Sequence, residues 1–396
     1  MIYRFANCVL DSERHLLLRD GEEIHVEPQV FDLLELLAQD AGKLVTKDRL
    51  IEVVWDGRIV SEATVSARIS AARTAVGDSG AAQKIIKTIP RRGFELVAAV
   101  AKEMPQSAVE STGVIHEARQ TIRFATSADG TKIAYAVSGD GPTIMRAGHF
   151  LTHLEMDWES PIWGPYLEKL SAGHRLVRYD QRGTGLSDLE LSDTSVDAYV
   201  DDLLAVADAA GIERCPLVAS SQGVPVAISF AARYPERVSG LVLFGGFAQG
   251  RSRRDHAYAR EEADALMALI RAGWGNPASA FMGAFTAVFC PDASTAEIGN
   301  LVEIQLASTT PDNAARIRRA IDDFDVTDRL GQVKAPTIVI HASKDALHPV
   351  SQGRLIASSI PGAEFLQVES NNHIYLPSDP AWTKIVDAQL GFLDSL

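Results

Sequence analysis

The segment VASSQGVPVA, residues 218–227, constrains the fold more than any other part of the chain. A strand-like apolar run leads directly into Ser220-Ser221-Gln222-Gly223, and a helix-compatible run follows without a break. A strand, a sharp turn and a helix in this order form a nucleophile elbow, the strained turn that lifts a serine above a sheet. Ser221 holds the centre of an Ala-x-Ser-x-Gly pattern, where the tight turn needs small neighbours. The segment therefore predicts a reactive serine at the end of a strand.

The length of the chain favours two domains. A single compact core is not expected for 396 residues. The 46% apolar and 23% charged residues are typical of a soluble globular protein. The stretch AKEMPQSAVESTGVIHEARQ, residues 101–120, is polar and lacks sustained periodicity, which indicates a linker. We therefore expect one domain in residues 1–100 and another in residues 121–396.

Several classes of protein are disfavoured. No apolar run approaches the length of a membrane span, and the start MIYRFANCVLDSERH lacks the apolar core of a signal peptide, so we expect a cytoplasmic protein. The cysteines are odd in number and widely spaced, which argues against a disulfide framework and favours buried thiols: Cys8, Cys215 and Cys290. The chain shows no phosphate loop, dinucleotide fingerprint or metal-ligand cluster, so we expect neither a metal ion nor a cofactor.

The first hundred residues carry the pattern of a small α+β domain. Short β-like runs come first, among them HLLLRDGEEIHV with a turn at Asp20-Gly21. A helix is predicted from Pro28, because apolar residues recur at helical spacing: Val30, Leu33, Leu34 and Leu37. A second helix, at about residues 47–54, follows the cap residue Thr46.

A third helix and a terminal hairpin complete this domain. The helix is expected to follow the cap residue Ser61 and to bury one face: Val65, Ile69, Ala72 and Val76. The last segment, KIIKTIPRRGFELVA, consists of two β-like runs joined by a tight basic turn.

Three of these segments resemble the winged helix-turn-helix domain of OmpR-type response regulators. LVTKDRLIEVVW resembles the family's second helix, which ends in a tryptophan, here Trp55. VSARISAARTAVGD resembles the recognition helix, and IKTIPRRGFEL resembles the wing with its Arg-Gly-aromatic signature. The resemblance covers about residues 1–98 and implies that this domain binds DNA.

The distribution of charge is compatible with DNA as a partner. The net charge of -14 would by itself argue against nucleic acid, because Lys and Arg drive phosphate binding. Residues 61–95, however, hold six basic and three acidic residues, a local net charge of +3 on the recognition helix and wing. The outward side chains of the helix are mostly small, so we expect little direct reading of bases. The candidate DNA contacts are Arg68 and Arg73 on the helix, with Lys87, Arg91 and Arg92 in the wing.

From residue 121 onward, strand-like runs alternate with helical patterns, which favours a mostly parallel, doubly wound sheet. Six candidate strands and their loops lie in the segments TIMRAGHF, HRLVRYDQRGTGLSD, CPLVASSQG, VSGLVLFGG, APTIVIHASKD and AEFLQVESNNHIYL. They resemble the α/β-hydrolase fold over residues 121–396, with YDQRGTGLSD matching the loop before the nucleophile strand. The helical stretch at about residues 250–330 matches the place where that fold inserts a cap.

The resemblance implies a catalytic triad. Ser221 occupies the nucleophile position, although Ala219 stands where the family usually has glycine. Asp345 follows TIVIH at the family's usual spacing, and His373 in SNNHIYL follows the last strand. The order Ser, Asp, His is the one this fold uses. His373 would accept the proton of Ser221, and Asp345 would hold the histidine in the required tautomer.

The expected oxyanion hole departs from the family pattern. One donor should be the backbone N–H of Gln222. The other should lie in AGHFLTHLEMDW, where most relatives have His-Gly; here His149 falls near the glycine and Phe150 becomes the expected donor. This departure predicts at most slow hydrolysis. We expect His149, His153 and Trp158 to line the pocket, with packing in the core an equal alternative for Trp158.

Two functions fit these patterns. The first is a one-component transcriptional regulator whose hydrolase-like domain senses a small, largely apolar organic ligand. The second is a serine hydrolase of esters or lactones with an accessory DNA-binding domain. They overlap, because a sensor with an intact triad can show weak esterase or lactonase activity towards its own inducer. The fusion to a DNA-binding domain favours the first, and a homodimer is compatible with paired DNA half-sites.

Overall fold

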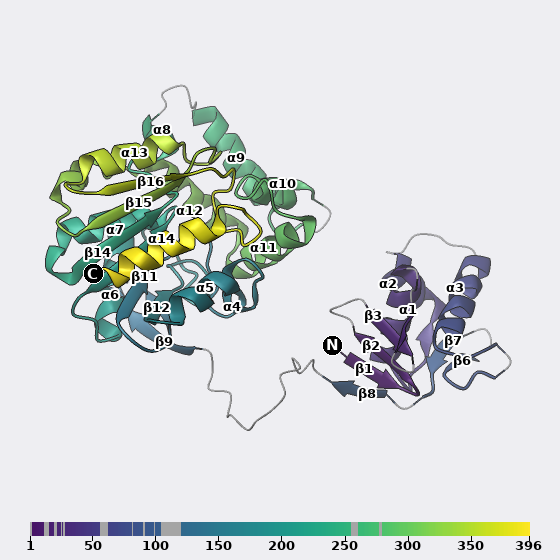
Figure 1. Ribbon diagram of the computed structural model, residues 1–396. Helices are drawn as coiled ribbons and strands as arrows, with labels where there is room; N and C mark the ends of the chain where they lie inside the picture. The colour runs from purple at the N-terminus through teal and green to yellow at the C-terminus, as the bar shows by residue number, and fades with distance from the viewer. Residues whose placement is uncertain are drawn as a thin grey trace. The chain divides into compact units, whose positions relative to one another are not determined.

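The chain forms two compact units, Met1–Ile115 and His116–Leu396, and Figure 1 draws both. Most of the expected linker, the turn at Asp20-Gly21, the cap Ser61 and the wing residue Arg91 lie outside the described residues. The computed structural model describes residues 2–11, 16–19, 22–24, 26, 28–55, 62–80, 82–89, 92–98, 100–103, 120–254, 260–276 and 279–396.

The first unit packs helices against two antiparallel sheets. Its strands are β1 Ile2–Phe5, β2 Cys8–Asp11, β3 Leu16–Arg19, β4 Glu22–Glu23, β5 Val45–Thr46, β6 Ile86–Ile89, β7 Gly93–Leu96 and β8 Val100–Glu103. Its helices are α1 Pro28–Gln39, α2 Lys47–Trp55 and α3 Glu62–Ala75. One sheet has the order β4-β3-β2-β1-β8, and the other has the order β5-β7-β6. The β6–β7 hairpin is the wing, as the sequence predicts.

The helical patterns of this unit are confirmed by burial and capping. The predicted apolar faces of α1 and α3 are buried: Val30, Leu33, Leu34, Leu37, Val65, Ile69, Ala72 and Val76. The side chain of Thr46 accepts a hydrogen bond from the backbone N–H of Arg49 at 3.3 Å, which caps α2. Local sequence signals were therefore sufficient to place these helices.

The second unit is built on a mostly parallel sheet. Its strands are β9 Thr121–Thr126, β10 Lys132–Ser138, β11 Thr143–Arg146, β12 Arg175–Tyr179, β13 Cys215–Ser220, β14 Val238–Phe244, β15 Thr337–Ala342 and β16 Glu364–Val368. Their order is β16-β15-β14-β13-β11-β12-β10-β9. The six strands from β11 to β16 match the six predicted segments and pair in parallel, whereas β9 and β10 add an antiparallel edge.

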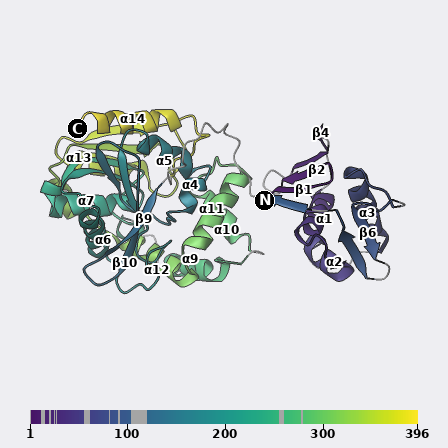
Figure 2. The same cartoon turned by 90° about the horizontal axis from the view of Figure 1, so that it is seen from below.

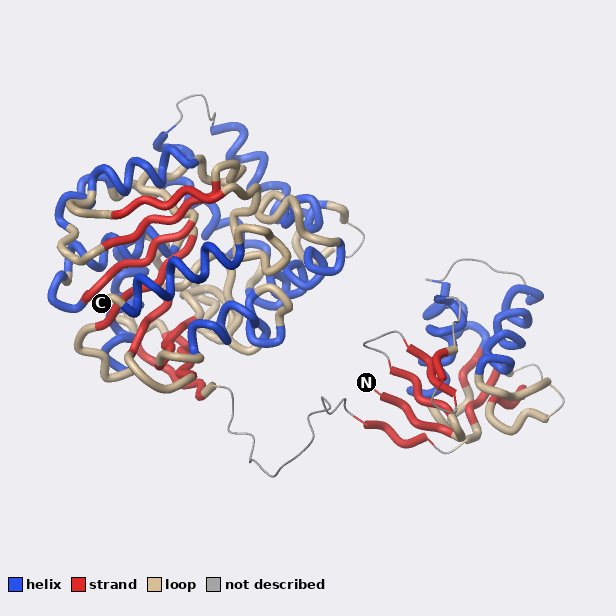
Figure 3. The backbone as a smooth tube through the Cα atoms, viewed as in Figure 1, coloured by secondary structure: helices blue, strands red, loops and turns tan. Residues whose placement is uncertain are grey.

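Helices cover both faces of this sheet. They are α4 Met156–Glu159, α5 Trp163–Ser171, α6 Val196–Ala209, α7 Gly223–Arg233, α13 Val350–Ser359 and α14 Trp382–Asp394. Helices α6, α7 and α13 pack on one face, and α5 and α14 pack on the other (Figure 2). The sheet is therefore a buried layer between helices, as the tube in Figure 3 shows.

A group of helices is inserted between β14 and β15, within the stretch expected to form the cap. They are α8 Arg251–Arg254, α9 Arg260–Gly273, α10 Phe281–Ala287, α11 Thr295–Ser308 and α12 Pro311–Asp323. Ser294 and Glu297 form a capping box at the start of α11, and Thr310 caps α12 immediately before Pro311. Figures 1 and 2 place α9, α10 and α11 together at one end of the sheet.

None of the described helices combines the length and apolar character needed to span a bilayer. The three cysteines are free, buried thiols, as expected. Burial raises the pKa of Cys215 and of Cys290 to about 12, which keeps both thiols protonated and unreactive.

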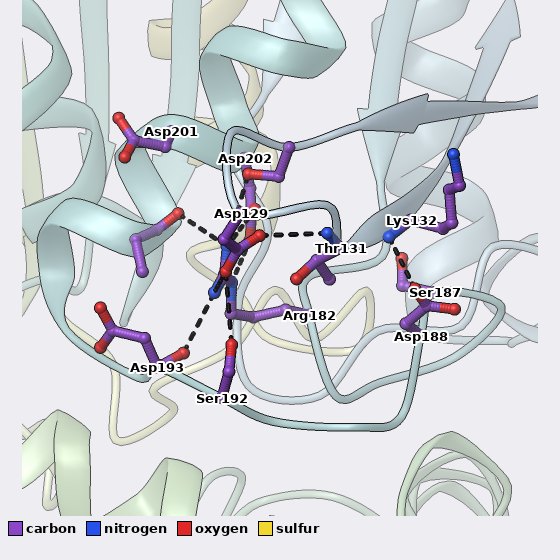
Figure 4. A network of polar contacts seen from close by, with 12 residues as sticks. Asp129, Thr131, Lys132, Arg182, Ser187, Asp188, Ser192, Asp193, Asp201 and Asp202 are labelled. Atoms are coloured by element: carbon purple, nitrogen blue, oxygen red, sulfur yellow. Dashed lines mark hydrogen bonds and ion pairs between the residues drawn. The ribbon is translucent and has the colours of Figure 1, made fainter.

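A buried arginine organises the loop after β12 (Figure 4). The Arg182 guanidinium donates to both carboxylate oxygens of Asp202 in α6, at 2.7 and 2.6 Å. It also donates to Asp129 in the β9–β10 turn at 2.8 Å. Arg182 is 1% exposed, so this charge is compensated inside the protein rather than by water. The network connects the YDQRGTGLSD loop to two other elements.

Removing Arg182 should destabilise the second unit. Arg182→Ala leaves the Asp202 carboxylate buried without its partner, so we expect the free energy of unfolding to fall by about 3–5 kcal/mol. Arg233 pairs with Asp201 at 3.0 Å on the surface, and Arg233→Ala should cost at most about 1 kcal/mol. Urea denaturation of both variants measures the difference, and equal losses would contradict the structural role of Arg182.

Candidate active site and DNA-binding surface

The turn at Ser221 has the strained backbone expected of a nucleophile elbow. Ser221 adopts a φ of +51°, in the left-handed region that non-glycine residues rarely occupy. Its N–H donates to the carbonyl of Phe244 at 3.0 Å, and α7 begins two residues later. A Cβ atom at Gly223 would lie 2.8 Å from the Gly148 carbonyl oxygen, so a side chain there would clash with the loop after β11. The glycine of the motif is required by this close approach.

The three predicted triad residues lie together at the ends of their strands. His373 Nε2 is 2.8 Å from Ser221 Oγ, and His373 Nδ1 is 2.6 Å from Asp345 Oδ2. Burial raises the pKa of Asp345, but contact with His373 and a backbone N–H bond outweigh it and lower this pKa below its usual value. The ionised carboxylate therefore holds a proton on Nδ1 and leaves Nε2 free to accept the serine proton. This geometry is suited to nucleophilic catalysis.

The inserted helices help to hold the histidine. The backbone N–H of His373 donates to the carbonyl of Phe289 at 2.8 Å. Phe289 lies between α10 and α11, and its ring centroid is 6.1 Å from that of His373. The position of His373 therefore depends on the segment inserted between β14 and β15 as well as on the sheet.

The two predicted oxyanion donors lie beside the serine. Gln222 is the N-cap residue of α7, and Phe150 lines the same cavity as Ser221. Within the described part of the chain, neither backbone N–H donates a hydrogen bond to another residue. Phe150 adjoins the cavity, whereas Gln222 is fully buried and lines neither described cavity, so the role of both as oxyanion donors stays a prediction.

A narrow cavity adjoins the triad, and a second cavity shares four of its lining residues. The first is lined by His149, Phe150, Trp163, Ser220, Ser221, Phe289, His373, Ile374 and Tyr375. The second is lined by Phe150, Leu151, Trp163, Phe289, Leu301, Ile304, Gln305 and Ile374. Aromatic and aliphatic side chains dominate both, which suits a small and largely apolar ligand.

Two of the three predicted pocket residues, His153 and Trp158, line neither described cavity, and for Trp158 the alternative of packing in the core holds. Only His149 lines either described cavity. Trp158 packs in the core, where its Nε1 donates to Gln120 at 2.7 Å, and His153 Nδ1 accepts from the Met156 N–H at 3.5 Å. Trp163, the first residue of α5, lines both described cavities.

The sequence reasoning also missed other lining residues. Ile374 and Tyr375 directly follow His373 along the chain, so proximity to the predicted base was a usable signal for them. Phe289 carried no local signal, since only the packing of the inserted helices brings it to the triad. Among the described residues, no group of His, Cys, Asp or Glu side chains is arranged to hold a metal ion.

The candidate DNA-binding surface lies on α3 and the wing. Lys87 and Arg92 are exposed on the wing, while Arg91 lies outside the described residues. Arg68 is half-buried, and its Nε donates to Gln29 in α1 at 3.2 Å. These residues remain candidate DNA contacts.

Arg73 does not fit the role predicted for it. It is 8% exposed, and its guanidinium donates to the Ile86 carbonyl at 3.1 and 2.9 Å and to Thr88 Oγ1 at 2.8 Å. Its side chain therefore joins the recognition helix to wing strand β6 instead of projecting toward DNA. Arg73 lies on α3 next to the buried face of the helix. Its guanidinium turns inward because strand β6 offers the Ile86 carbonyl and the Thr88 hydroxyl as acceptors.

Comparisons with known proteins agree with both units. Residues 168–368, just over half of the chain, match the family described as serine aminopeptidase, S33. The chain belongs to this family of α/β hydrolases. Residues 21–96 match the C-terminal domain of transcriptional regulatory proteins, so an OmpR-type winged helix is fused to the hydrolase unit. A DNA-binding domain implies DNA as a partner.

One relative of this S33 hydrolase is the 2-hydroxy-6-oxononadienedioate/2-hydroxy-6-oxononatrienedioate hydrolase of Paraburkholderia phymatum, 31% identical over 208 residues, or 49% of this chain and 68% of that protein. A hydrolase from Pseudomonas aeruginosa is 25% identical with a TM-score of 0.57, covering 68% of this chain and 98% of its own. The enol-lactonase from Burkholderia xenovorans, 22% identical, shares the fold with a TM-score of 0.56, covering 69% and 100%.

Arg73→Met should act through folding. It removes the hydrogen bonds between helix and wing, so we expect the first unit of the full-length protein to lose about 2 kcal/mol or more of stability. The affinity for DNA should then fall by the same factor for a binding site selected by the protein from a random pool and for DNA of unrelated sequence. Thermal unfolding and DNA titrations provide the measurements.

Lys87→Ala is the matched control. It should leave stability within about 0.5 kcal/mol and reduce the salt dependence of DNA binding by about one phosphate contact. If Arg73→Met kept its stability and weakened only the selected sequence, Arg73 would be a base-reading residue after all.

Proposed function

We propose that this protein is a transcriptional regulator that binds DNA through its winged helix and senses a small, largely apolar organic ligand beside Ser221. The proposal rests on one observation: the same chain holds a DNA-binding domain and, in its hydrolase-fold unit, a cavity beside the Ser221, His373 and Asp345 triad. A ligand that prefers one conformation of the protein can shift its DNA affinity by as much as that preference allows.

The cavity supports a ligand that carries a carbonyl group. Ser221 and Phe150 line one small cavity, and the backbone N–H of Phe150 makes no hydrogen bond within the described residues. Similarity to a dienedioate hydrolase and to an enol-lactonase supports the same class of ligand. Esters and lactones fit both the apolar lining and the triad.

Slow turnover would follow from the same geometry. Ser221 Oγ would add to the ligand carbonyl while His373 Nε2 takes its proton, and the Phe150 and Gln222 N–H groups would stabilise the oxyanion. Collapse of this intermediate would expel the alcohol, and water activated by His373 would release the acid. Hydrolysis of the inducer would end the signal.

We further propose that the protein binds paired DNA half-sites as a homodimer. Sedimentation of the protein with DNA would test this proposal.

Ser221→Ala separates sensing from catalysis. This variant should retain binding of an aryl ester and the ligand-dependent change in DNA affinity, because the cavity remains. Wild type should hydrolyse 4-nitrophenyl butyrate slowly, and both Ser221→Ala and His373→Ala should lose this activity. DNA titrations with and without ester, alongside release of 4-nitrophenol, measure the two functions.

The contrary outcome identifies an enzyme. Efficient turnover by wild type, together with loss of the DNA response in Ser221→Ala, would make the switch depend on an acyl-enzyme or a product. An unchanged DNA affinity with every ester and lactone tested would remove the sensor function and leave a serine hydrolase with an accessory DNA-binding domain.

A further inference from the structure

His149 lines the Ser221 cavity and carries an unused hydrogen-bond acceptor. It is 3% exposed. Its Nδ1 is 3.3 Å from the carbonyl oxygen of Phe150, and a carbonyl can only accept, so Nδ1 carries the proton. In a neutral imidazole Nε2 is then an acceptor, and this atom is buried without a hydrogen-bond partner among the described residues.

The surroundings keep the ring in this neutral form. Burial lowers the pKa of His149 well below its usual value, and the positive charges of Arg146 and of protonated His373 lower it further. The ring also packs on Trp163, with centroids 4.7 Å apart, which holds its orientation. The acceptor therefore persists throughout the physiological pH range.

Two other polar groups of the cavity wall are already engaged. His373 Nε2 contacts Ser221, and the Tyr375 hydroxyl accepts from Gln389 at 3.1 Å. A buried acceptor that binds nothing is unfavourable, whereas a ligand that donates to it gains a bond in a site of low dielectric.

We propose that Nε2 of His149 selects ligands bearing a hydroxyl or N–H group close to the carbonyl that Ser221 would attack. Hydroxy esters, hydroxy lactones and N–H carbamates belong to this class, and their counterparts without a donor do not. The proximity follows from the cavity itself, since His149 and Ser221 both line it. The inference rests on the proposed function, because it specifies the ligand of that site.

The test compares two aryl esters that differ by one donor. We expect wild type to favour 4-nitrophenyl 2-hydroxybutyrate over 4-nitrophenyl butyrate by about tenfold or more in kcat/KM, after correction for their rates with hydroxide. His149→Phe keeps a ring but removes the acceptor, so the preference should disappear. His149→Gln supplies an amide oxygen and should restore part of it.

His174→Phe is the matched control. His174 is also buried and also pairs Nδ1 with a carbonyl, that of Leu170 at 3.2 Å, but it lines neither described cavity. The hydroxyl preference should survive in this variant. Thermal unfolding of all variants shows that each is folded under the assay conditions, and the Gln variant decides the outcome if the Phe variant is unfolded.

The two proposals fail separately. A preference that persists in folded His149→Phe, or that is absent in wild type, overturns the role of His149 whatever the DNA response. A preference lost in His149→Phe, with no effect of either ester on DNA affinity, supports His149 and overturns the sensor. If wild type hydrolyses neither ester, calorimetric binding of both to Ser221→Ala gives the same comparison.

Discussion

The contact between the Ser221 turn and the loop after β11 is the constraint on which the site depends. Gly223 approaches the Gly148 carbonyl so closely that no side chain fits between them. The same loop continues into His149 and Phe150, which line the cavity with Ser221. One piece of backbone packing therefore sets the positions of the nucleophile, a candidate oxyanion donor and a candidate ligand acceptor.

The segment inserted between β14 and β15 contributes directly to the cavity beside Ser221. Phe289 accepts the His373 N–H, packs near its ring and lines both cavities. A ligand beside Ser221 would therefore contact the rigid end of the sheet and the inserted segment together. Such a ligand can favour one arrangement of that segment, which is the physical requirement for a sensor. The same contacts would keep water from the reacting carbonyl.

In the winged helix, hydrogen bonds join α3 to the wing, and few exposed basic residues remain as candidate DNA contacts. Arg73 joins α3 to the wing, so the two elements that would meet DNA form one body. The exposed bases Lys87 and Arg92 remain for phosphates, while the outward side of α3 carries small residues such as Ser70 and Ala71. Such a surface suits binding to DNA through its shape and its phosphate backbone, even though the whole chain has a net charge of -14.

The sequence predicted both folds and the three residues that meet at the Ser221 turn, because strand ends and turn residues are local properties and because these segments resemble two known families. Ser221, Asp345 and His373 each follow a recognisable strand, and parallel pairing brings such ends to one edge. Only the tertiary structure decided which face a side chain presents. Trp163 lines the cavity whereas Trp158 bonds to Gln120 in the core, and Arg73 turns inward because strand β6 offers it the Ile86 carbonyl and the Thr88 hydroxyl. These outcomes depend on contacts between segments far apart in the chain, which no local pattern records.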